Sequence, residues 1–109
     1  MKTRVIHIGL PELDEDELVA IGELAQETVI NHVFTHLAKS EVKDIEAVAR
    51  ITRDETLNLE LELYIEVPIF VRVDVDALVE EALRRAYQKV EEKLRSLAHG
   101  EKDERETQV

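Results

Sequence analysis

The 109-residue chain has no cysteine and no tryptophan, and it contains only three glycines, two prolines, two tyrosines and two phenylalanines. Without cysteine, disulfide bonds and thiolate metal sites are excluded. The glycines stand apart at positions 9, 22 and 100, so no glycine-rich loop can cradle a phosphate. Neither Ser40 nor Ser96 lies in a nucleophile-elbow sequence. The sequence therefore favours a non-enzymatic protein, with no catalytic residue to name and no cofactor.

Long apolar runs are also missing. No stretch approaches the roughly 18 consecutive apolar residues of a membrane-spanning helix, and the first residues show no signal-peptide pattern. We therefore expect a soluble, cytoplasmic protein with no membrane partner. Acidic residues outnumber basic ones 25 to 14, for a formal net charge of −11, so no nucleic-acid partner is expected. A high content of Glu, Lys and Arg without cysteine is typical of thermophile proteins.

The most regular feature that is present runs from Leu57 to Val75, where every odd-numbered residue is aliphatic. Alternation with a period of two predicts a strand with one apolar and one polar face. At roughly 3.3 Å per residue the run would span about 60 Å, far longer than an ordinary strand. Pro68 is the natural place for a break, because it cannot donate a ladder hydrogen bond. We predict strands at 57–66 and 69–74, the second being either separate or a bent continuation of the first.

Two further strands are predicted at 2–8 and 42–53. The strands at 42–53 and 57–66 are expected to form a hairpin, and their apolar patterns restrict the length of the loop between them. To bring Ile51 opposite Leu59, aliphatic against aliphatic, the loop must have an odd length, such as three residues, or a bulge.

Helical periodicity predicts two helices, from Asp14 to about Lys39 and from Asp74 or Asp76 to about Ala98. Asp14 and Glu17 have the spacing of a capping box, and Gly100 fits the end of the second helix. Apolar residues of the first helix extend beyond a single stripe and cover much of its circumference. A second cover, such as another subunit, would bury the extra surface.

The predicted order is β-α-β-β-(β)-α. A sheet with one apolar face and two amphipathic helices predict an α+β, two-layer sandwich. Its mainly antiparallel sheet of three to four strands would be covered on one face by the two helices. We predict a single domain at residues 1–100 and a disordered, charged tail at residues 101–109.

Two histidines are the candidate metal ligands. His32 and His36 are four residues apart on a predicted helix, the spacing with which one helix supplies two ligands to a metal. Val33 stands where the zincin motif has a catalytic glutamate, and His7 or a glutamate would have to complete the ligand set. The alternative is that both imidazoles lie at the edge of the apolar stripe or in a subunit contact.

The polar face of the alternating run is acidic. Alternate residues on one strand face lie about 7 Å apart, a spacing that a carboxylate pair or a cation site could use. Such faces are more commonly plain solvated surface, and their more plausible use is to attract a basic protein partner. The candidate partner-binding residues are Glu60, Glu62, Tyr64 and Glu66.

The segment Leu57–Val67 (LNLELELYIEV), followed by Val73–Asp76 (VDVD) and the helical stretch Ala77–Ala86, resembles a family of small acidic archaeal proteins known only as a domain of unknown function. The resemblance covers about residues 10–98 and implies no activity. At the level of topology alone, the chain is also similar to double-stranded-RNA-binding domains. The acidic start of the second helix, Asp76–Glu81, would repel phosphate and argues against that function.

These observations predict a protein–protein interaction or oligomerisation domain that forms a homodimer. The alternative is a metal-binding protein or metal-dependent enzyme that uses His32 and His36.

Overall fold

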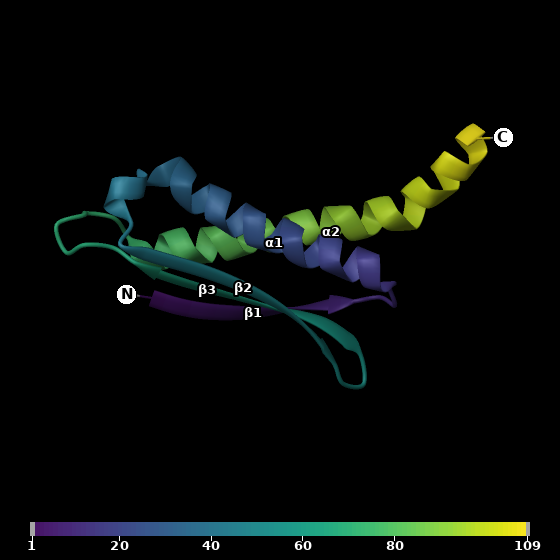
Figure 1. Ribbon diagram of the computed structural model, residues 1–109, viewed down its shortest axis with the longest axis horizontal. Helices are drawn as coiled ribbons and strands as arrows, with labels where there is room; N and C mark the ends of the chain where they lie inside the picture. Colours follow the sequence, from purple (N-terminus) through teal and green to yellow (C-terminus); the bar gives the residue numbers. More distant parts are fainter. Residues whose placement is uncertain (1, 109) are drawn as a thin grey trace.

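A computed structural model describes residues 2–108, and the side chains of residues 2–98. The elements, in chain order, are β1 (Lys2–Leu10), α1 (Glu15–His36), a short 3-10 turn (Lys39–Glu41), β2 (Asp44–Arg53), β3 (Leu57–Glu66) and α2 (Val75–Gln108). Figure 1 shows two layers, with the three strands below and both helices lying across the same face of the sheet. The predicted α+β sandwich is confirmed.

The sheet is antiparallel, with β3 between β1 and β2. The β2–β3 loop has three residues, 54–56, and it places Ile51 opposite Leu59 as predicted. Odd-numbered residues of β3 are buried and even-numbered residues are half-exposed along the whole strand. Alternation therefore predicted both the register and the buried face, because a slip of one residue would turn every aliphatic side chain toward solvent.

The strand predicted at 69–74 does not form. After Pro68 the chain makes a turn, in which the Val71 N–H donates to the Pro68 carbonyl at 3.0 Å, and then runs without regular structure to α2. Both sides of β3 are already occupied by β1 and β2, and this segment has to cross from the sheet layer to the helix layer. Its alternating valines still pack against the core, but from a loop: Val67, Val71 and Val73.

Both helices begin with local caps. The Asp14 carboxylate accepts a hydrogen bond from the Glu17 N–H at 2.8 Å, and the Glu17 carboxylate accepts one from the Asp14 N–H at 3.0 Å, which confirms the capping box. Asp74, and not Asp76, caps α2, because its carboxylate accepts from the Ala77 N–H at 3.0 Å. α1 ends at His36, three residues before the predicted end, and the 3-10 turn follows.

α2 continues to Gln108, so the predicted end near Ala98 and the stop at Gly100 were wrong. One glycine inside a helix costs about 1 kcal/mol relative to alanine, and the residues after it are mostly good helix formers. Side chains of residues 99–109, and Val109 as a whole, lie outside the described part. The disordered tail at residues 101–109 stays a prediction.

Candidate interaction surfaces

The histidine pair lies where the C-terminal half of α1 meets the start of α2. Their ring centroids are 4.5 Å apart, with the rings edge to face. His32 is only 8% exposed, whereas His36 is exposed. The buried His32 Nε2 has no hydrogen-bond partner. The predicted adjacency on one helix is therefore present, with one ring inside and one outside.

Burial lowers the pKa of His32 below its usual value, and the nearby His36 and Arg85 lower it further. Glu81 acts in the opposite direction. Its carboxylate is already bound to Arg84, whose Nε donates to it at 3.0 Å, and that bond lowers the pKa of Glu81. His32 is therefore a neutral imidazole beside a carboxylate that is engaged elsewhere.

A metal site would need more than this pair. Neutral imidazole is the metal-binding form of histidine, but nowhere in residues 2–98 do three or more His, Cys, Asp or Glu side chains meet in a ligand cluster. His7, one of the residues considered as a third ligand, lies on β1 beside Glu60, with 3.6 Å between its Nε2 and the Glu60 carboxylate. It is on the open face of the sheet, which the helices do not cover, so it cannot complete a site with His32.

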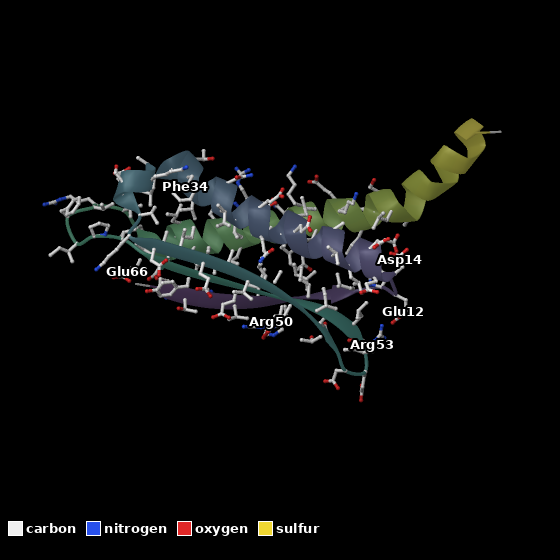
Figure 2. All side chains as sticks on the ribbon, viewed as in Figure 1. Glu12, Asp14, Phe34, Arg50, Arg53 and Glu66 are labelled. Atoms are coloured by element: carbon white, nitrogen blue, oxygen red, sulfur yellow. The ribbon has the colours of Figure 1, made fainter. Side chains whose placement is uncertain are left out.

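The open face of the sheet carries all four candidate partner-binding residues, and Figure 2 shows Arg50 on this side. Arg50 Nη1 donates to Glu60 at 3.3 Å and to Glu62 at 3.4 Å. The Tyr64 hydroxyl donates to Glu66 at 2.8 Å, and Lys43 Nζ lies 3.3 Å from the same carboxylate. The acidic stripe is thus partly neutralised within the chain.

The hydrogen bond between Tyr64 and Glu66 shifts the pKa values of both groups. The hydroxyl's hydrogen bond, with Lys43 beside it, lowers the pKa of Glu66, and the same bond raises the pKa of Tyr64. Glu66 therefore stays ionised, and Tyr64 stays a hydrogen-bond donor, across the physiological pH range.

The β2 edge of the molecule has an apolar hollow of about 370 Å³ between β2 and the first half of α1. Val19 on α1 is 54% exposed and Ile51 on β2 is 38% exposed. Gln26 reaches across from α1 and donates to the Ala47 carbonyl on β2 at 2.9 Å. The sequence had pointed to extra apolar surface on the first helix, and Val19 is the part of it that stays exposed in this chain.

The β1 edge differs, because charges tie it to α2. Lys2 Nζ lies 2.9 Å from the Asp76 carboxylate, and Arg4 Nη1 donates to Glu80 at 2.9 Å. The lysine lowers the pKa of Asp76 through this contact.

An exposed apolar turn follows β3, and the sequence analysis missed it. Ile69 is fully exposed and Phe70 is 75% exposed. We had placed both on the strand predicted at 69–74. Pro68 was the available signal. A proline at the end of a strand indicates a turn, and residues in a turn that leaves the sheet do not share its buried face.

Comparison with known proteins agrees with the geometry. Residues 10–93 match the family described as "Protein of unknown function (DUF3194)". The chain belongs to this family. The resemblance found from the alternating segment is thereby confirmed.

Relatives in this family come from archaea. The chain is 60% identical over 104 residues to the uncharacterized protein PF0383 of Pyrococcus furiosus, covering 94% of each chain. It is 58% identical over 100 residues to the uncharacterized protein TK0644 of Thermococcus kodakarensis, covering 92% of this chain and 93% of the relative. The thermophile character expected from composition, and the archaeal origin implied by the family resemblance, are confirmed in these relatives.

Two solved structures share the fold. A crystal structure from Thermococcus onnurineus NA1 has a TM-score of 0.85 and 65% identity, and the match covers 91% of this chain and 96% of that one. The solution structure of the hypothetical protein mth677 from Methanothermobacter thermautotrophicus has a TM-score of 0.69 and 20% identity, over 82% and 97% of the two chains. The second likeness concerns the fold alone.

No helix within residues 2–108 is both long and apolar enough to cross a membrane.

Proposed function

We propose that the protein is a non-enzymatic protein–protein interaction domain that assembles as a homodimer. The observation that carries this proposal is the exposed apolar surface at the β2 edge, where Val19 and Ile51 flank an open hollow. Charged residues make up 36% of the chain, so exposed aliphatic side chains around a concave surface stand out. Grouped apolar surface of this kind marks contact sites more often than a single exposed side chain does.

The backbone supports the same proposal. β2 lies at one side of the described sheet, so no strand pairs with its outer side. An edge strand presents N–H and C=O groups that can pair with another chain. Gln26 binds the carbonyl of Ala47, but no described helix or strand covers the outer side of β2 as a whole.

Sedimentation velocity tests the homodimer. The untagged protein should shift from monomer to dimer as its concentration rises from about 1 µM to about 1 mM, because standard protein interfaces have dissociation constants in or below this range. A strict monomer at the highest concentration would overturn the proposal. Replacement of Val19 and Ile51 by serine should weaken the dimer, and Phe70→Ser serves as the matched control, because it removes an exposed apolar side chain away from this edge.

Metal binding through His32 and His36 is the alternative function. One observation favours it, namely the buried His32 Nε2 without a partner. Metal analysis of untagged protein and thermal shifts with zinc, nickel and manganese decide it. Stoichiometric metal that is lost in His36→Gln and kept in His7→Gln would establish this alternative, and the absence of both metal and thermal shift would remove it.

A further inference from the structure

The β2 edge carries a sequence that is complementary to itself. Reading outward from Val48, the strand has alanine on each side at Ala47 and Ala49, then Glu46 against Arg50, then isoleucine at both ends of the segment Ile45–Ile51. In an antiparallel pair related by a two-fold axis at Val48, each residue meets its mirror position in the other copy.

We propose that two copies of the chain dimerise by antiparallel pairing of β2 with β2, centred on Val48, so that two three-stranded sheets join into one of six strands. This rests on the homodimer proposed above and deepens it by naming the surface and the register. The partner is a second copy of this chain, chosen on charge complementarity.

In this register Glu46 lies opposite the partner's Arg50, and the symmetry repeats the pair. Directly opposite side chains on one face have Cβ atoms about 4.5–5.5 Å apart, close enough for an ion pair. Glu46 has no ion pair with any residue in the described part of the chain. Arg50 uses only Nη1 for its bonds to Glu60 and Glu62, so Nη2 and Nε stay available for a further acceptor.

The helix-covered face matches as well. Ile51 comes to lie opposite the partner's Ile45, and Ala47 opposite the partner's Ala49. The pairing therefore places an aliphatic side chain against the exposed side of Ile51, next to the hollow that Val19 lines. Of the two exposed aliphatic residues that motivate the homodimer, this register covers Ile51 directly, and Val19 lies on α1 at the hollow beside it.

Other registers lack this match. An axis at Ala47 puts Glu46 against the partner's Val48, and an axis at Ala49 puts Ile45 against the partner's Arg53. Axes at Glu46 or Arg50 bring identical charges face to face, which is destabilising. Axes between residues pair the apolar face of one strand with the polar face of the other.

The ends of the pairing bring two cations together, Lys43 and the partner's Arg53. Each is already neutralised in its own chain. Lys43 lies 3.3 Å from Glu66, and Arg53 donates to Glu12 at 3.0 and 3.1 Å. Figure 2 labels Arg53 and Glu12. The central opposite-charge pairs therefore decide the electrostatics of the interface.

The opposite edge of the sheet cannot pair with itself in this way. β1 has the sequence KTRVIHIGL, with no acidic residue, so no register of β1 against β1 contains an opposite-charge pair. Its Lys2 and Arg4 are bound to α2. β1 provides an internal control for the proposal.

Cysteine crosslinking tests the axis, because the natural chain has no cysteine. Val48→Cys should form a disulfide-linked dimer on mild oxidation, since opposite Cα atoms in an antiparallel pair are about 4.5–5.5 Å apart, within the range that a disulfide spans. Val5→Cys on β1, 42% exposed, is the matched control and should crosslink much less at the same concentration. Equal crosslinking at the two positions would overturn the proposed axis.

Charge reversal tests the register. Glu46→Arg should raise the dimer dissociation constant roughly tenfold or more, because it sets like charges opposite each other at two places. Arg50→Glu should do the same. An equimolar mixture of the two variants should recover the dimer, since arginine then meets glutamate at every such position, and so should the double variant. Thermal unfolding of each variant at a concentration where it is monomeric checks that the fold is kept.

The outcomes separate the two proposals. A strict monomer in the unmodified protein removes the homodimer and the register together. A wild-type dimer that resists both charge reversals, or that shows no recovery in the mixture, removes the β2 register and leaves the homodimer standing. Crosslinking at Val48 with recovery in the mixture establishes both.

Discussion

Replacing His32 by leucine tests the account of the buried histidine most directly. His32 is 8% exposed and its Nε2 has no hydrogen-bond partner, so folding strips water from that nitrogen without compensation. A buried, unsatisfied polar group costs about 1–3 kcal/mol. Leucine keeps apolar volume in the same space but loses the ring contact with His36, which offsets part of the gain. At about pH 8 we expect His32→Leu to be as stable as the wild type or more stable by about 1 kcal/mol.

The effect should grow as the pH falls. Burial lowers the pKa of His32 in the folded protein below its unfolded value of about 6.5. Below about pH 6.5 the unfolded chain binds a proton that the folded chain does not, so the wild type loses stability toward lower pH, by at most about 1.4 kcal/mol per pH unit. The leucine variant lacks this loss. The lowered carboxylate pKa values of Glu66 and Asp76 act mainly below about pH 5, where those groups begin to protonate in the unfolded chain.

Denaturant unfolding followed by circular dichroism at about pH 8, 6.5 and 5, at one fixed protein concentration, measures both effects. His7→Gln, at an exposed position on β1, is the control for loss of an imidazole and should keep the stability of the wild type at about pH 8. A loss of more than about 2 kcal/mol in His32→Leu at about pH 8 would refute the reasoning, because it would mean that Nε2 has a stabilising partner. An unchanged slope between about pH 6.5 and 5 would refute the assignment of that slope to His32.

Three further changes test separate parts of the fold by the same unfolding assay. Gly22→Ala should stabilise the protein by about 0.5–1 kcal/mol, because alanine favours the helix more than glycine does. The added methyl would lie 3.6 Å from the Ala49 side chain, an ordinary contact. A loss of stability would show that the packing of α1 against β2 cannot accept the methyl. Asp14→Ala should cost about 1 kcal/mol through loss of the cap, whereas Asp16→Ala should cost less, and equal losses would contradict the capping role. Phe70→Ser should change the unfolding free energy by less than about 0.5 kcal/mol, because the ring is 75% exposed; a larger loss would place that ring in the folded core.

Features that depend on neighbours in sequence were predicted correctly. The cap at Asp14 requires only that Glu17 be three residues away, and the 4.5 Å contact of His32 with His36 follows from one helical turn. The β2–β3 register also followed, because aliphatic residues come face to face on one side of the sheet only with an odd loop or a bulge.

Predictions failed where the same local pattern has two tertiary outcomes. Val71 and Val73 alternate as regularly as the residues of β3, yet they pack from a loop, since both sides of β3 are occupied and the chain crosses here from the sheet layer to α2. Gly100 is a good stop signal, but its cost of about 1 kcal/mol is small enough for the helix to continue through it.

The sequence by itself determined the two faces of the sheet, the cap at Asp14, the pairing of Ile51 with Leu59 and the family, because each depends on residue type at short spacing. Only the tertiary structure decided which histidine is buried, that His7 lies on the other side of the sheet, and that β2 has an open side beside Val19 and Ile51. These depend on how α2 crosses the sheet and on which strand occupies the middle. The period-two pattern predicts that a strand has a buried face, but the order of strands decides which backbone edge stays open to a second molecule.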